Sequence, residues 1–173
     1  MKLCNKYDKK ILKEKLLVEP FKRITVSYYR YILIHNPGEY RDNLYLKFSE
    51  LGIFGRIHLA KEGINAQISV PAHSWDLFKA ILDNDEFTKN INLNKAIEDS
   101  GKSFFKLKIK VRNKIVADGL KEDEYDITKT GKHLYAKQFN EAMDNPDALV
   151  FDMRNHYESR IGRFEKAICP SVE

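Results

Sequence analysis

The order of strand and helix patterns in residues 24–116 is the feature that most limits what this chain can fold into. The first run, ITVSYYRYILI, is rich in β-branched and aromatic residues, which favours a strand. The next, EYRDNLYLKFSELG, repeats its apolar residues every three to four positions and ends at Gly52, which indicates a helix. Two further runs, IFGRIHLA and GINAQISV, flank a turn at Lys61–Glu62 and predict a β-hairpin.

A helix and a strand complete this pattern. PAHSWDLFKAILDN has Pro71 near its start and an apolar stripe along it, which predicts a second helix. FFKLKIKVRNKIV, residues 104–116, alternates apolar and charged residues, which predicts a strand. The resulting order, β-α-β-β-α-β, predicts an α+β domain of ferredoxin-like arrangement. In that arrangement an antiparallel sheet carries both helices on one face.

The second face of such a sheet is left for water or for a partner. Because alternate side chains of a strand point to opposite faces, the polar residues of the predicted strands should gather on this uncovered face. In the first strand the pattern leaves open whether Tyr29 and Tyr31 or Tyr28 and Arg30 point outward, but either choice puts a tyrosine there. The cations expected on the uncovered face are Arg56 and His58 of the hairpin and Lys106, Lys108, Lys110, Arg112 and Lys114 of the last strand.

Cations that meet phosphates and aromatic rings that stack on bases are the ingredients of RNA-binding sheets. We therefore predict salt-dependent RNA binding by these cations, His58, Tyr29 and Tyr31. The alternative is that lysines on an edge strand only discourage edge-to-edge aggregation. The stretch Lys102–Lys114 contains no acidic residue, and a cation at every other position exceeds what edge protection requires.

The overall composition excludes several other classes of protein. The chain has 173 residues, 43% of them hydrophobic, and no apolar run approaches the ~18 residues of a membrane helix. Its two cysteines, Cys4 and Cys169, form no CxxC pattern, and its five histidines never pair at i, i+3 or i, i+4. We therefore expect a cytoplasmic protein with no membrane partner, no metal site and no cofactor. EDSGKS fails as a phosphate loop because Ala96 stands where that motif requires glycine.

The two ends of the chain differ in composition from its middle. Residues 1–23 carry the whole excess of positive charge, and KKILKEKLLVEPF predicts a short helix stopped by Pro20. This leader is either a solvated helix or a basic arm for a polyanion. Residues 117–133 contain Gly119 and the acidic KEDEYD and indicate a connector. Residues 134–173 then contain a helix pattern, LYAKQFNEAMD, and the strand pattern ALVF.

The end of the chain resembles the opening of a rhodanese domain. The segment DMRNHYESRIGRFEKAI matches the pattern D-x-R-x-x-x-E followed by a glycine, with Arg163 where histidine is usual and Lys166 where glycine is usual. The residues matched are Asp152, Arg154, Glu158 and Gly162, with Phe164 and Ala167. From the residues alone, the first three could form an acid–base group or a structural ion pair at the end of a strand, and we favour the ion pair.

A second resemblance covers nearly the whole chain, from about Thr25 to Ala167. The stretches FGRIHLAKEGINAQISVP, GKSFFKLKIKVRNKIVADG and DALVFDMRNHYE resemble the bacterial tRNA uridine hydroxylase family. That family joins an acylphosphatase-like domain of ferredoxin-like fold to a rhodanese domain. The resemblance implies oxygen-dependent 5-hydroxylation of the wobble uridine, with tRNA as the partner.

The same resemblance implies that the chemistry needs a cysteine in a loop several tens of residues beyond the opening motif. This sequence ends first, and Cys169, followed by Pro170, has no loop to enclose it. We therefore expect an incomplete α/β rhodanese segment, truncated near its start, with no catalytic residue and no activity by itself. Residues 145–173 should pack on another surface or be poorly ordered. The alternative is a non-catalytic binding module for a polyanion or a protein partner.

Overall fold

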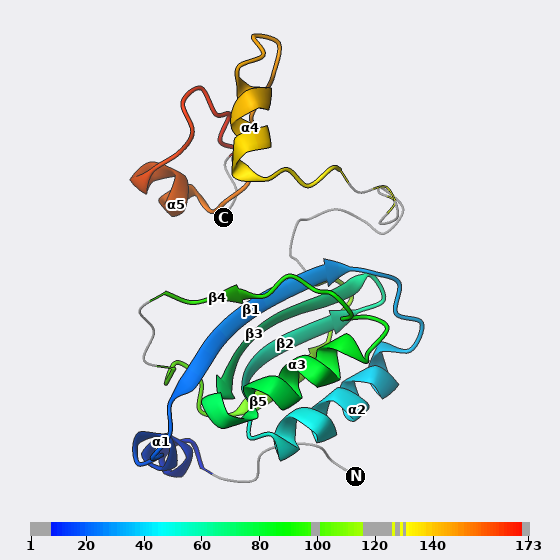
Figure 1. The fold of residues 1–173 in the computed structure, drawn as a ribbon, viewed down its shortest axis with the longest axis vertical. Helices are drawn as coiled ribbons and strands as arrows, with labels where there is room; N and C mark the ends of the chain where they lie inside the picture. Colours follow the sequence, from blue (N-terminus) through cyan, green and yellow to red (C-terminus); the bar gives the residue numbers. More distant parts are fainter. Residues whose placement is uncertain (1–7, 98–100, 116–125, 127–128, 130, 171–173) are drawn as a thin grey trace. The chain divides into compact units, whose positions relative to one another are not determined.

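The computed structural model describes residues 8–97, 101–115, 126, 129 and 131–170 (Figure 1). The chain forms two compact units, residues 1–129 and residues 130–173. The first unit contains the predicted sheet and the second contains the segment that resembles a rhodanese opening. Most of the expected connector, residues 117–133, lies outside the described residues, as does Cys4.

The first unit is a five-stranded sheet with two long helices against one face (Figure 1). Asn36 caps the first of these helices, because its side chain accepts a hydrogen bond from the Glu39 backbone amide, and Pro37 begins the helix. The elements are α1 (Lys9–Leu17), β1 (Arg23–Tyr31), α2 (Pro37–Glu50), β2 (Phe54–Ala60), β3 (Gly63–Pro71), a 3₁₀ turn (Ala72–Ser74), α3 (Trp75–Asp83), β4 (Asn94–Lys95) and β5 (Leu107–Val111).

The strand order corrects the prediction of a fully antiparallel sheet. The order is β4-β1-β3-β2-β5, and β5 pairs with β2 in parallel, so the sheet is mixed. The position beside β1 is held by β4, which has only two residues and pairs antiparallel at Val26 and Ser27. Two residues are too few to give a periodic signal, so the sequence pattern assigned the next long alternating run to that place. The run lies instead at the opposite edge.

The last strand is also shorter than residues 104–116. Its pairing with β2 runs from Leu107 to Val111, and the Arg112 amide still donates to the carbonyl of Leu59. The chain then turns, and the Ile115 amide donates to the carboxylate of Glu62 at 2.6 Å. The alternation of faces therefore does not extend to Lys114, because that residue lies beyond the strand.

The hydrophobic core lies between the helices and the covered face of the sheet. Phe48 of α2 and Phe78 of α3 are fully buried and meet edge to face, with ring centroids 5.7 Å apart. The covered face of the sheet contributes alternate residues of its strands, as the period of two predicted. These buried sheet residues are Val26, Tyr28, Ile57, Leu59, Ile64, Ala66, Ile68, Val70, Leu107 and Ile109.

The second unit contains two short helices, α4 (Ala136–Met143) and α5 (His156–Ile161). Its only strand-like pairing among the described residues is one parallel bridge between Phe151 and Ile168. In residues 131–170, only Asp152 and Ser159 are buried, and no hydrophobic side chain is. These residues do not form a complete α/β layer, and their assignment to a rhodanese domain stays a prediction.

Candidate nucleic-acid interface

The face of the sheet opposite α2 and α3 presents two rows of polar side chains. We call it the polar face. Register places Arg56 opposite Lys108 on one side and opposite Gln67 on the other, and Gln67 in turn lies opposite Ser27. Ser27 pairs with Asn94 of β4. The first row therefore crosses all five strands, from two cations at the β5 edge to amide and hydroxyl groups at the β4 edge.

The second row adds an aromatic ring to the polar face. It runs through Lys110, His58, Asn65 and Tyr29, which are paired in register on β5, β2, β3 and β1. Tyr28 is 1% exposed in the core, whereas Tyr29 is 56% exposed. The structure thus resolves the alternative left open by the sequence, because Tyr29 and Tyr31 share the polar face, and Tyr31 is half-buried there.

The cations of the polar face are close enough to perturb one another. The positive charges of Lys108 and then Arg112 lower the pKa of Lys110. Partial burial and then the charges of Arg112, Lys110, Arg56 and Lys108 lower the pKa of His58, which favours the neutral form of this ring. In the part of the chain that the structure describes, no salt bridge to Arg56, Lys108, Lys110 or Arg112 is present. An anionic ligand would relieve this mutual repulsion.

Two predicted cations lie away from the rows. Lys106 precedes β5 and is exposed, with its Nζ 5.7 Å from the centroid of the Phe105 ring. Lys114 is half-buried in the segment after β5, so its placement in the alternating row was wrong. The other candidates of the last strand and hairpin, Lys108, Lys110, Arg56 and His58, share one face, with Arg112 immediately after the strand.

Other parts of the chain cross the polar face at its two ends. At one end the residues that begin at Gly101 and lead to β5 lie on the sheet, and Ser69 Oγ donates to the carbonyl of Gly101 at 2.7 Å. At the other end Asn65 Nδ2 donates to the carbonyl of Ile115 at 3.4 Å. The sequence prediction of a wholly uncovered face was therefore wrong in part. The physical cause is topological, because β4 and β5 lie at opposite edges and their connection has to cross.

Arg23 fixes the crossed end and is a structural cation. Its guanidinium is buried, pairs with Glu19 and donates to the carbonyls of Gly52 and Ser69. It also lies over the ring of Phe54, with Cζ 4.0 Å from the ring centroid. All of its donors face the protein, so we do not assign it to the interface.

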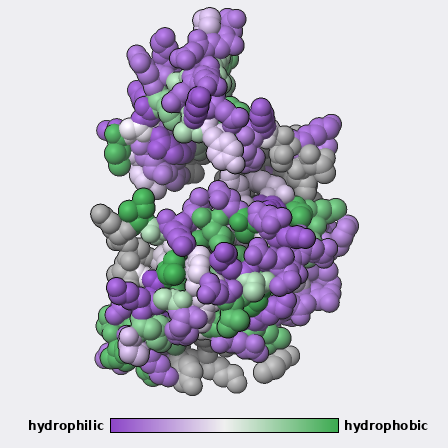
Figure 2. Space-filling view, in the orientation of Figure 1, coloured by the Kyte–Doolittle hydropathy of each residue, from purple (hydrophilic) through white to green (hydrophobic). Residues whose placement is uncertain are grey.

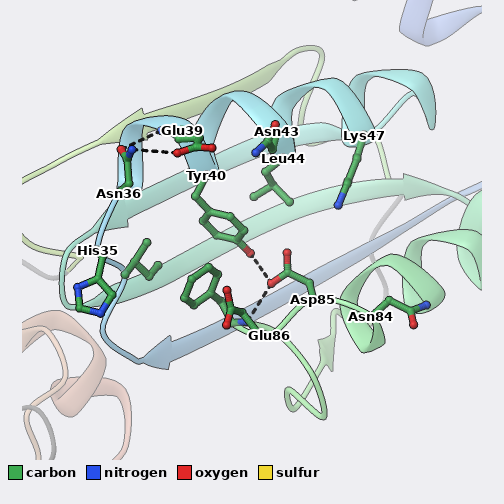
Figure 3. A pocket seen from close by; sticks show the side chains of 12 residues that line it. His35, Asn36, Glu39, Tyr40, Asn43, Leu44, Lys47, Asn84, Asp85 and Glu86 are labelled. Carbon is green, nitrogen blue, oxygen red and sulfur yellow. Dashed lines mark hydrogen bonds between the residues drawn. The ribbon is translucent and has the colours of Figure 1, made fainter.

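The helix side of this unit contains a separate hollow of about 820 Å³ between α2 and the loop after α3 (Figure 3). Three carboxylates line it, from Glu39, Asp85 and Glu86, against Lys47 and His35. Tyr40 reaches into it and donates to Asp85 at 3.0 Å, and burial together with this carboxylate raises the pKa of the phenol. The acids disfavour a phosphate backbone here. On this side apolar residues are scattered among polar ones, without one broad patch (Figure 2).

The rhodanese-like motif of the second unit is held by hydrogen bonds. Arg154 donates from Nε and Nη2 to the two carboxylate oxygens of Asp152, at 2.9 and 2.7 Å, and from Nη2 to the carbonyl of Gly162. These bonds lower the pKa of Asp152. Glu158 accepts from the backbone amide of Asn155 at the start of α5. The geometry is that of an ion pair and a helix cap, and it does not bring the two acids together as an acid–base pair.

The described ranges contain no group of three or more His, Cys, Asp or Glu side chains placed to hold a metal ion. None of their helices has the length and apolar character needed to cross a lipid bilayer. Cys169 is a free, half-buried thiol.

Curated relatives and one solved structure are similar to this chain. The curated relatives are named tRNA uridine(34) hydroxylase: one from Leptospira interrogans is 49% identical over 99% of this chain, and one from Photorhabdus laumondii is 49% identical over 96%. The chain spans about half, 47%, of the length of each. A solved structure, the dark state of the BLUF protein BlrB, aligns with a TM-score of 0.40 at 14% identity over 53% of this chain and 74% of that one, a likeness too small to carry an argument.

The match to a family model covers the same residues as the sheet. Residues 23–115 match the UPF0176 acylphosphatase-like domain, from the first residue of β1 to the buried Ile115 after β5. This match covers more than half of the chain, and its limits enclose both rows of the polar face. The relatives named tRNA uridine(34) hydroxylase are similar to this chain over nearly all of its residues. From the family match, the chain belongs to the UPF0176 acylphosphatase-like domain family.

Proposed function

We propose that this chain holds tRNA for oxygen-dependent 5-hydroxylation of the wobble uridine. The polar face of residues 24–116 is the tRNA-binding surface in this proposal. The main support for this proposal is the row of side chains that crosses all five strands, from Lys108 and Arg56 to Asn94. No member of this row is a carboxylate. The names of the relatives support the choice of tRNA as the polyanion.

The physical chemistry of the polar face suits a folded RNA. Clustered cations gain free energy by neutralising phosphates and releasing counterions, so binding should weaken steeply with salt. Tyr29 offers an exposed ring for stacking, and the imidazole of His58, two strands away in the same row, is a second flat ring. Asn65 lies between His58 and Tyr29 in the second row. Gln67 lies between Arg56 and Ser27 in the first row, and both residues add amide groups.

The binding experiment uses the whole chain and bulk tRNA in a fluorescence anisotropy titration between ~50 and ~200 mM salt. The variant K108Q/K110Q/R112Q removes three cations of the polar face. Its matched control, K47Q/K79Q/K89Q, removes three exposed lysines of the helix side. We expect the first variant to lose at least about tenfold in affinity and to flatten the salt slope by roughly 2–3, while the control keeps the wild-type slope.

Three results would contradict the binding proposal. Equal losses in the two variants would mean that net charge alone matters. A wild-type affinity that ignores salt would remove the electrostatic argument. Polyglutamate bound as tightly as tRNA would favour a general polyanion module instead.

We further propose that residues 134–173 correspond to the opening of a rhodanese domain and that the chain acts in the cytoplasm, where tRNA is modified. The catalytic part of the proposal has its own test. Mass spectrometry of tRNA nucleosides from cells lacking the gene is compared after rescue by this chain or by a full-length relative. We expect 5-hydroxyuridine only with the relative, and its restoration by this chain would show that the chain catalyses the reaction itself.

A further inference from the structure

A second hollow, of about 400 Å³, lies at the β4 end of the polar face. Its floor is formed by β1, β3 and β4, and its wall by Ser103 and Phe104, which precede β5. The side chains that matter here are Ser27, Gln67 and Asn94, which are consecutive members of the first row, and Phe104 of the wall. We call this hollow the row-end pocket.

The chemistry of the row-end pocket differs from that of the cationic edge. Two amides and three hydroxyls line it, the hydroxyls from Thr25, Ser27 and Ser103. In the described residues the side chains of Ser27, Gln67 and Asn94 make no hydrogen bond. Each amide offers both donors and acceptors. Phe104 adds a half-buried ring. The one cation in the lining, Lys95, has its Nζ 4.5 Å from the centroid of the Trp75 ring. The site therefore suits a neutral, flat group with polar edges better than a phosphate.

The row also sets the order of groups along a bound strand. Neighbouring strands lie roughly 4.8 Å apart, so the distance from Arg56 across β3 to Ser27 is about 10 Å. A nucleic acid whose phosphates meet Lys108 and Arg56 can therefore turn a base toward Gln67 and Asn94. Proteins that read single-stranded RNA use this division, with cations on the backbone and amides and rings on unstacked bases.

We propose that the row-end pocket binds one unpaired nucleobase of the RNA. The base inserts beside Phe104 and exchanges hydrogen bonds along its polar edge with the amides of Gln67 and Asn94. This inference rests on the proposed function, because the cationic end of the same row holds the backbone. It adds a selective contact, so that single-stranded RNA with bases binds more tightly than a backbone of equal charge.

The test compares two probes of identical length and charge, decauridylate and an abasic ribose-phosphate decamer, at one salt concentration. We expect the wild-type chain to bind decauridylate about tenfold more tightly, the size of effect that one well-stacked base supplies. Ser27→Leu fills the pocket and should reduce this ratio to roughly two or less. The control Ser49→Leu adds the same side chain to an exposed position of α2 and should keep the full ratio.

A second variant, Gln67→Ala/Asn94→Ala, removes the amides without adding volume and should also lower the ratio. It keeps the test decisive if Ser27→Leu fails to fold. A wild-type chain that binds both probes equally, with a normal salt slope, overturns the pocket and leaves the tRNA proposal standing. The pocket proposal is also overturned if Ser27→Leu or Gln67→Ala/Asn94→Ala keeps the tenfold preference for decauridylate. A wild-type chain that binds neither probe nor tRNA overturns both proposals.

Discussion

The two units of this chain differ in regular structure and in how they are stabilised, because the sheet unit is built from long helices and strands and the second unit has only two short helices. The sheet unit buries a continuous core in which Phe48 and Phe78 meet between the helices. In the described part of the second unit, large apolar side chains stay exposed, among them Leu149, Phe151 and Ile161. There the order rests on hydrogen bonds, on the contact between the Phe139 and Phe164 rings, and on the partly exposed ion pair of Asp152 with Arg154.

This difference indicates which unit is stable when folded by itself. Burial of apolar side chains supplies most of the stability of a small domain, because each buried side chain contributes about 1.5–3 kcal/mol. Surface hydrogen bonds and ion pairs contribute far less, since water competes for the same groups. We therefore expect the sheet unit to unfold cooperatively and the second unit to open at little cost.

Removal of one core ring should give the largest effect and is the hardest test of this contrast. Phe48→Ala deletes a fully buried ring and should lower the free energy of unfolding by about 3–5 kcal/mol. Phe151→Ala, in the second unit, deletes a ring that is 55% exposed and should change it by less than about 0.5 kcal/mol. Urea unfolding followed by far-UV circular dichroism and by Trp75 fluorescence measures both. A large loss with Phe151→Ala would show that its ring is buried in the native protein.

Glycine substitutions should give the next largest contrast. Gly63 has φ +148°, and an added Cβ would lie within 2.1 Å of the Arg30 carbonyl oxygen on the paired strand. Gly63→Ala should therefore cost about 2 kcal/mol or more. Gly162 of the second unit has an extended backbone, φ −174°, and open space around its Cα. Thermal unfolding of Gly162→Ala should match the wild type, and an equal shift for both variants would break the comparison.

The smallest expected effect is the change in stability of the second unit at acidic pH. Hydrogen bonds from Arg154 lower the pKa of Asp152 below its ordinary 3.8, so the folded state gains stability above that pH and loses it as the pH falls through the lowered value. We expect the NMR signal of Arg154 Nε to move below about pH 4 and to stay constant from pH 5 to 7. Asp152→Asn should remove this transition, whereas Asp147→Asn, at an exposed site, should keep it. A transition that survives in Asp152→Asn would assign it to another acid.

Much of the sheet unit could be predicted because its local patterns agree with its tertiary structure. The period of two placed Ile57 and Leu59 in the core and Arg56 and His58 on the polar face. Gly52 and Pro71 marked the end of α2 and the start of α3 to within a few residues, although Pro71 itself ends β3. The candidate cations were found for the same reason, since alternation along a strand is a local property.

The row-end pocket could not be predicted in this way. Asn94 belongs to a strand of two residues, and the wall beside Phe104 exists only because the chain crosses the sheet between its two edges. Gly101 was a weak signal for this crossing, because its φ of +72° and its contact with Arg23 suit only glycine. The order of residues predicted the β2–β3 hairpin but not the pairing of β5 with β2 or of β4 with β1.

The sequence by itself determined the long helices and strands of the sheet unit, the apolar faces of β2 and β3, and the family to which the chain belongs. Only the tertiary structure decided that β5 pairs with β2 in parallel, that Tyr29 faces outward, and that Ser27, Gln67 and Asn94 line one pocket. The physical reason is that side-chain periodicity is fixed within a strand. Strand order depends instead on the free energy of contacts between segments far apart in the chain.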